Sequence, residues 1–86
     1  MTIPTAREAP IFVRAYPDEE CGCPVEEWVA RGVCLTLHFE ADGSMEVYAD
    51  TGDWDQNLSL KATTMEAARD EAFAWVNALP EEGAAL

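Results

Sequence analysis

The chain has few positively charged residues. Its 86 residues include five lysines and arginines against seventeen aspartates and glutamates, so the formal net charge is -12 at pH 7. Such an excess repels nucleic acid, anionic membranes and acidic substrates, and it attracts basic surfaces. Because 49% of the residues are hydrophobic, the chain differs from a disordered acidic tail, which lacks the apolar side chains that offset the entropy of ordering. We therefore expect a folded protein that binds a basic partner, and neither nucleic acid nor a membrane.

Long hydrophobic runs are also missing. No run of about 18 apolar residues is present, which excludes a membrane-spanning helix, and residues 1–7 lack the apolar segment of a signal peptide. The cysteines Cys21, Cys23 and Cys34 are odd in number, which argues against a secreted disulfide framework and favours reduced thiols. These absences indicate a cytoplasmic protein.

The first half of the chain contains one clear strand and one ambiguous segment. The length predicts a single domain over residues 1–86, with loose ends at 1–9 and 81–86. Residues 11–16 are rich in β-formers and predict a strand, and residues 17–24 have the composition of a loop. Residues 24–30 fit either a short helix near 24–31, bracketed by Pro24 and Gly32, or an extended lead into the next strand.

Residues 33–39 and 44–50 alternate apolar and polar side chains, as two strands of a half-buried hairpin do. A two-residue Asp-Gly turn would place Phe39 opposite Glu46, with an acid on the core face. A three-residue turn with Gly43 in the left-handed region pairs 39 with 45, 37 with 47 and 35 with 49, all apolar. We expect the three-residue turn, with His38 opposite Glu46 on the outer face.

The sequence of the second half of the chain predicts a polar loop over 51–56, a strand over 57–62 and a helix over 67–79. Residues 63–66 resemble a capping box, and one apolar stripe of the helix would lie on the sheet; it comprises Met65, Ala68, Ala72, Trp75, Val76 and Leu79. The predicted fold class is α+β, with an antiparallel sheet of three to four strands and the C-terminal helix packed on one face.

Cys21, Cys23, Cys34 and His38 are the residue types that bind zinc, but their spacing is unfavourable. Cys34 and His38 are four apart on a predicted strand, hence roughly 13 Å apart at about 3.3 Å per residue. The same distance excludes a Cys-His nucleophilic pair. We predict no metal and no cofactor.

Enzyme signatures are missing too. The chain has no glycine-rich phosphate loop, no serine elbow and no dinucleotide fingerprint. Neighbouring carboxylates such as Asp53 and Asp55 are expected in any acidic chain, and residues 50–61 lack the closing glutamate of a calcium loop. We predict no catalytic residues.

The acids themselves are the candidate site. Lys61 is the only lysine, so the acidic face is not interspersed with positive charge, as a merely solubilising surface would be. The candidate partner-binding residues are Glu40, Asp42, Glu46, Asp50, Asp53, Asp55, Glu66, Asp70 and Glu71. Trp28 and Trp54 lie among acids in the sequence; burial in the core is the favoured interpretation, and if exposed they would be aromatic anchors of an interface.

Small size, the α+β pattern and the acid runs at 18–20, 26–27 and 53–55, together with the acids of the helix, resemble the small acidic anti-defence proteins of phages and mobile elements. That group includes anti-CRISPR proteins and other DNA mimics. The resemblance implies a stoichiometric inhibitor in the host cytoplasm, whose carboxylates occupy the Lys/Arg sites of a nucleic-acid-binding complex such as a CRISPR surveillance complex. The alternative is an acidic protein-interaction or regulatory module without DNA mimicry.

Overall fold

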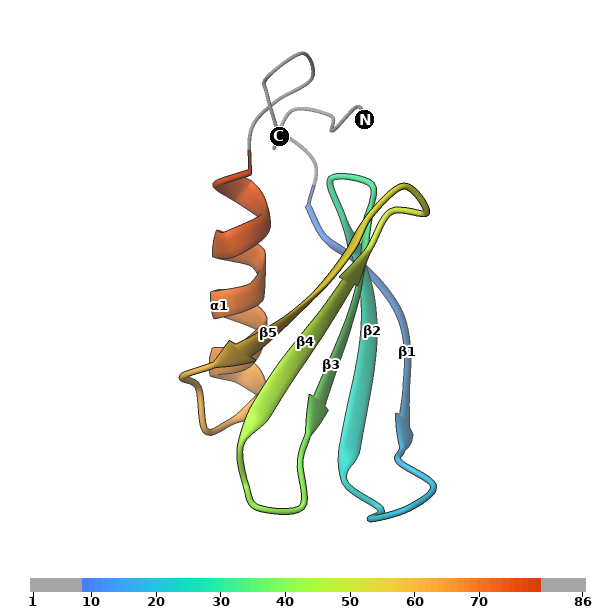
Figure 1. Cartoon of the computed structure of the whole chain (residues 1–86), viewed down its shortest axis with the longest axis vertical. Helices are drawn as coiled ribbons and strands as arrows, with labels where there is room; N and C mark the ends of the chain where they lie inside the picture. The colour runs from blue at the N-terminus through green and yellow to red at the C-terminus, as the bar shows by residue number, and fades with distance from the viewer. Residues whose placement is uncertain (1–8, 80–86) are drawn as a thin grey trace.

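A computed structural model describes residues 9–79, which form one five-stranded antiparallel sheet and one helix (Figure 1). The strands follow one another in the order β1-β2-β3-β4-β5. Their bounds are β1 Ile11–Pro17, β2 Pro24–Ala30, β3 Val33–Phe39, β4 Met45–Asp50 and β5 Asp55–Leu60, and α1 spans Met65–Asn77. The predicted α+β class and C-terminal helix are confirmed. The expected loose ends lie outside the described residues, apart from Ala9.

The predicted strand count was too low, because residues 24–30 form a strand and the suggested short helix is wrong. β2 pairs with β1 on one side and with β3 on the other. Its side chains alternate, so that Trp28 lies opposite Leu35 on the face toward α1 and Val29 lies opposite Cys34 on the other face. The β-branched Val25 and Val29 suit such a two-sided ladder. Tertiary pairing thus overrides the favourable helix boundaries that Pro24 and Gly32 suggested.

The β3–β4 hairpin has the predicted register, with Phe39 opposite Met45 and His38 opposite Glu46. Its turn is the expected three-residue one. The amide of Gly43 donates to the carbonyl of Glu40, and the amide of Glu40 donates to the carbonyl of Ser44. Gly43 has φ 90°, a conformation that costs glycine little because it lacks a Cβ atom.

β5 and α1 match the predictions with small shifts. β5 begins at Asp55, two residues earlier than predicted, because Asp55 and Gln56 pair with Asp50 and Ala49. The helix begins after Thr64, whose hydroxyl oxygen accepts from the amide of Ala67. The buried apolar residues of the sheet and helix form one cluster of Ala30, Val33, Leu35, Leu37, Met45, Val47, Ala49, Ala68, Ala72 and Val76.

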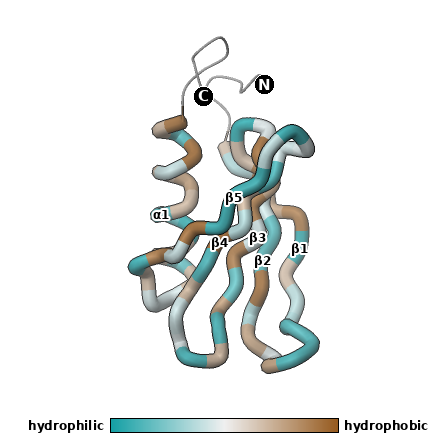
Figure 2. Tube along the Cα trace, viewed as in Figure 1, coloured by the Kyte–Doolittle hydropathy of each residue, from teal (hydrophilic) through white to brown (hydrophobic). Residues whose placement is uncertain are grey.

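The sheet has two unlike faces. The first, here called the helix face, packs on α1 and carries the apolar alternating positions of β3 and β4. The outer face carries the alternate positions and is not covered by α1. Hydrophilic residues gather at the turns between β1 and β2, β3 and β4, and β4 and β5 (Figure 2). The fold thus separates one layer of apolar packing from an open polar surface.

The two tryptophans considered as anchors pack against other aromatic rings. Trp28 makes edge-to-face contacts with Phe12 and Phe73, both at 5.2 Å between ring centroids. Trp54 meets Trp75 edge-to-face at 6.3 Å. Both tryptophans are half-buried against the core cluster, which agrees with the favoured interpretation.

Arg31 ties the sheet to the C-terminal end of the helix. It lies with Gly32 in the two-residue β2–β3 turn, where both residues have positive φ (52° and 73°), as type I′ turns require. The Arg31 Nη1 atom donates to the carbonyls of Val76 at 2.7 Å and Leu79 at 3.0 Å. The last turn of α1 contains no basic residue, so this buried guanidinium supplies the positive charge that a helix C-terminus favours.

We predict that Arg31→Gly lowers the free energy of unfolding by about 1–3 kcal/mol, the range for hydrogen bonds to a charged group. Glycine adopts the same positive φ without strain, so the variant tests the loss of the guanidinium. Lys61→Ala removes one positive charge from an exposed residue and should change stability by about 0.5 kcal/mol at most. Urea unfolding gives the free energy of unfolding of both variants. Equal losses of stability would mean that the net charge of the protein, and not the contacts of Arg31, is responsible.

A second tie joins β2 to α1 through Glu26 and Arg69. The Arg69 Nε atom donates to Glu26 Oε1 at 2.7 Å, and the Trp28 indole nitrogen donates to the same oxygen at 2.9 Å. The Glu26 side chain is only 12% exposed. Hydrogen bonds from Arg69 are the main reason that the pKa of Glu26 lies below its ordinary value.

Because the folded-state pKa of Glu26 is lowered, its stabilising contribution is present above the unfolded-state pKa of about 4.3 and is lost as pH falls through the folded-state value. We therefore expect Glu26→Gln to destabilise the protein at pH 7 and much less near pH 3. Thermal unfolding from pH 7 to pH 3 measures the difference from the parent protein. Glu66→Gln, at an exposed helical site, is the control and should change stability at pH 7 less than Glu26→Gln does.

Candidate functional site

Six of the nine predicted acidic residues lie on the outer face of β4 and β5 or in the two turns beside these strands. Asp50 of β4 pairs directly with Asp55 of β5. Tyr48 and Glu46 precede Asp50 at alternate positions, so all three side chains lie on the same face of β4. The Tyr48 hydroxyl donates to Asp55 Oδ2 at 3.1 Å. We call the acids of this face and of its two adjoining turns the acidic strip; they are Glu40, Asp42, Glu46, Asp50, Asp53 and Asp55.

The arginines of the described region are engaged elsewhere. Arg14 pairs with Glu27 at 3.0 Å, Arg69 pairs with Glu26, and Arg31 caps the helix. Among residues 9–79, no ion pair joins a lysine or arginine to any member of the acidic strip. The strip therefore presents carboxylates without compensating side-chain charge.

The three predicted acids of the helix do not join this strip. Glu66 and Asp70 are exposed on α1, which covers the opposite face of the sheet (Figure 1). Glu71 has a structural role, because its carboxylate accepts from the backbone amides of Lys61 at 2.9 Å and Ala62 at 3.0 Å. It fixes the connection between β5 and α1. The structure thus divides the predicted set into a sheet group and a helix group.

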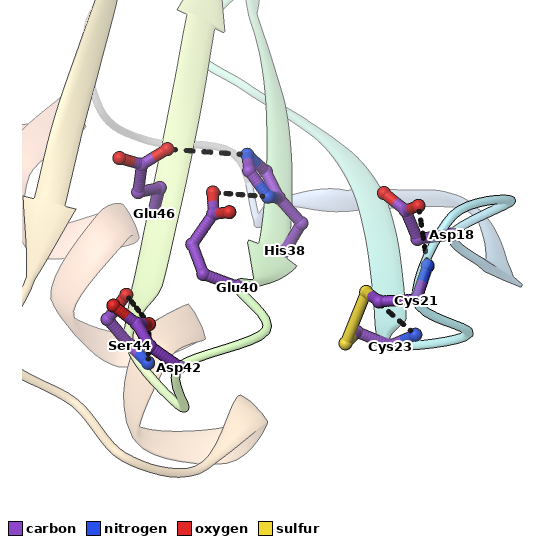
Figure 3. A network of polar contacts seen from close by, with 8 residues as sticks. All are labelled: Asp18, Cys21, Cys23, His38, Glu40, Asp42, Ser44 and Glu46. Carbon is purple, nitrogen blue, oxygen red and sulfur yellow. Dashed lines mark hydrogen bonds and ion pairs between the residues drawn. A yellow bond between two sulfur atoms is a disulfide. The ribbon is translucent and has the colours of Figure 1, made fainter.

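At one end of the strip, the His38 ring faces two carboxylates (Figure 3). Its Nδ1 atom is 3.2 Å from Glu40 Oε1, and its Nε2 atom is 3.8 Å from Glu46 Oε2. The pKa of Glu40 is raised from its ordinary value, first by its hydrogen-bonding contact with Glu46, then by partial loss of solvent, with His38 acting in the opposite direction. Glu46 therefore lies close enough to Glu40 to disfavour the charged form of the Glu40 carboxyl group.

The neighbouring turn is held by its own side chains. Asp42 Oδ1 accepts from the Ser44 amide at 2.9 Å and from the Ser44 hydroxyl at 2.6 Å (Figure 3). These bonds, first that from the hydroxyl, lower the pKa of Asp42. Asp42 thus stays ionised and stabilises the turn that separates Glu40 from β4.

The cysteines differ from the expectation of three reduced thiols. Cys21 and Cys23 form a disulfide in the β1–β2 turn, and Cys34 is an exposed free thiol on β3. Asp18 Oδ1 accepts from the amide of Glu20 at 2.7 Å and that of Cys21 at 3.4 Å. This tight turn, with Gly22 at φ 71°, brings the two thiols together, which a count of cysteines does not reveal.

A shallow, open hollow of about 750 Å³ lies on the outer face beside His38. Its floor includes Val25 and Thr36, and its rim includes Arg14, Tyr16 and the acids of the β1–β2 turn. Arg14 and the Tyr16 hydroxyl are both bonded to the Glu27 carboxylate, at 3.0 and 2.7 Å. Arg14 and Tyr16, two of the polar groups that line the hollow, are thus already engaged by Glu27.

No family model, curated protein or solved structure matches this chain. Within residues 9–79 the helix is too short to cross a bilayer, at 13 residues against the roughly 20 that a spanning helix needs.

Sequence reasoning paired His38 with Glu46 but missed Glu40 as a third member of the group. The signal was present, because residues 38 and 40 lie two apart along one chain and alternation places both on one face.

We predict that Glu46→Gln lowers the pKa of Glu40 toward its ordinary value, because Glu46 is the largest cause of the upward shift. A carboxyl-detected NMR titration of the two proteins measures the change. Asp50→Asn, which removes a charge two strand positions beyond Tyr48, is the matched control and should leave the Glu40 titration nearly unchanged. A Glu40 pKa insensitive to Glu46→Gln would contradict the contact.

Proposed function

We propose that this protein is a stoichiometric inhibitor that binds the basic surface of a nucleic-acid-binding protein through the acidic strip. The observation that carries the proposal is the division of charge in the fold. The arginines of the described region pair with Glu26, Glu27 and the helix end, so the carboxylates of β4, β5 and their turns remain available to a cationic partner.

The mechanism is competition for the sites that hold phosphates. Carboxylates spaced along two paired strands would occupy lysine and arginine side chains of the partner and exclude nucleic acid from them. The charge of -12 would speed association by electrostatic steering, and added salt would weaken the complex. The resemblance to anti-defence proteins makes a CRISPR surveillance complex the partner of choice for a first experiment.

One observation favours a second function, that of an interaction module without DNA mimicry. The edge strand β1 exposes three consecutive apolar residues, Ile11 at 59%, Phe12 at 52% and Val13 at 51%. An unpaired edge with apolar side chains can add a strand from a partner. Binding of that kind would depend little on salt and would leave nucleic-acid binding by the partner intact.

The test is a competition assay with a purified CRISPR surveillance complex and its target DNA. We expect the protein to reduce DNA binding at low salt, and the double variant Asp50→Asn/Asp55→Asn to inhibit about thirtyfold less, since two lost contacts to charged groups are worth roughly 1 kcal/mol each. Both substitutions keep the size of the side chain and an acceptor oxygen.

The matched control is Glu66→Gln/Asp70→Asn, which removes the same charge from the helix on the opposite side of the sheet. It should inhibit as well as the parent protein. If the two double variants weaken inhibition equally, net charge and not the acidic strip is responsible. Inhibition that persists at high salt and is lost in Phe12→Ser would favour the β1 edge instead.

A further inference from the structure

Three side chains with metal-binding atoms converge at the end of the β3–β4 hairpin. One nitrogen of His38 and one oxygen each of Glu40 and Glu46 lie within 4.8 Å of one another. Among residues 9–79, no other set of three or more His, Cys, Asp or Glu side chains brings its donor atoms this close together. The donors are one imidazole nitrogen and two carboxylate oxygens. Such a mixed set discriminates between metal ions better than a cluster of acids does.

The backbone holds these donors in place. His38 and Glu46 face each other across a paired position of β3 and β4, and Glu40 follows His38 by two residues on the same face. The backbone bonds between Glu40 and Ser44 and the side-chain bonds of Asp42 close the intervening turn. The Cα positions are thus fixed by the hairpin, and only side-chain torsions remain to be adjusted.

The side chains have room for that adjustment. They are partly exposed, His38 at 25%, Glu40 at 41% and Glu46 at 35%. Bonds of about 2.0–2.2 Å to a tetrahedral ion place its donors roughly 3.3–3.6 Å apart. The three donors therefore need to close by about 1 Å. Rotation of partly exposed side chains can supply this movement without disturbing the core.

The ordinary interpretation, an ion pair on the sheet surface, leaves charge uncompensated. A single imidazole carries at most one positive charge, and it faces two carboxylates. No lysine or arginine among residues 9–79 forms an ion pair with either glutamate. A divalent cation would compensate both carboxylates at once and would use the imidazole as a neutral ligand.

We propose that His38, Glu40 and Glu46 form a binding site for a divalent first-row transition ion, with zinc as the reference probe. An imidazole ligand favours zinc or a neighbouring transition metal over magnesium and calcium, which prefer oxygen donors. Three protein ligands leave a further position open to solvent or to a donor from a partner.

The site does not depend on the proposed inhibitory function, because it needs no partner. Binding of one divalent ion would lower the negative charge at one end of the acidic strip by two. The opposite end, with Asp50, Asp53 and Asp55, would keep its charge. Metal binding is therefore measured on the isolated protein, and its failure would leave the competition assay above unaffected.

The experiment is isothermal titration of the chelator-treated full chain with zinc chloride, under non-reducing conditions and in a Cys34→Ser background that removes the free thiol. We expect one ion per chain. Glu40→Gln, Glu46→Gln and His38→Gln should each weaken binding at least tenfold, the lower bound for disturbing even the outer shell of a metal site. Magnesium chloride at the same concentration should bind at least tenfold more weakly than zinc chloride.

Asp70→Asn is the matched control, since it removes one exposed carboxylate from α1 and should bind zinc like the parent protein. Circular dichroism of each variant checks that the fold is kept. A second measurement, selective broadening of the amide signals of residues 38, 40 and 46 by manganese chloride, locates the ion without any substitution. No binding, or zinc affinity unchanged by all three substitutions, would overturn the proposal, as would broadening confined to other residues.

Discussion

The arginines of the described region determine how this acidic chain can fold, because each one supports a different junction. Arg31 meets the carbonyl end of α1, Arg69 joins α1 to β2, and Arg14 joins β1 to β2 through Glu27. A chain with five basic residues and seventeen acidic ones cannot neutralise its surface. It can place its few positive charges where elements meet, and there a hydrogen-bonded charge is worth more than on an open surface.

The placement of positive charge determines where the negative charge remains. The two glutamates of β2 are compensated, and so is the end of the helix dipole. Six of the remaining carboxylates lie on β4, β5 and the turns beside them, while others lie in the β1–β2 turn and on α1. The placement of the arginines therefore explains both the stability of the fold and the acidic character of the outer face. No further feature is needed to make this face acidic.

Much of the fold could be predicted from local patterns. The alternation of 33–39 and 44–50 gave the correct register, because only the three-residue turn keeps Glu46 off the core face. β2 was harder to predict, because Glu26 lies on the helix face of the strand, where the alternating pattern calls for an apolar residue. The main partner of that carboxylate is Arg69, 43 residues later, and the nearby Trp28 indole also donates to it. The same distance in sequence hides the capping role of Arg31, which looks like a turn residue until α1 packs beside it.

The candidate site divides in the same way. Alternation alone placed Glu46 and Asp50 on the outer face, whereas the separation of the helix acids required knowing which face α1 covers. Alternation places Glu40 on the face of His38, but Glu40 lies just beyond the end of β3, so strand register alone does not predict that its side chain meets both His38 and Glu46. A metal ion at that end and a basic partner on the strip would compete for the same two carboxylates. Loading the site would then weaken partner binding at the His38 end while leaving the Asp50–Asp55 end active, so the two proposals predict antagonism between ion and partner.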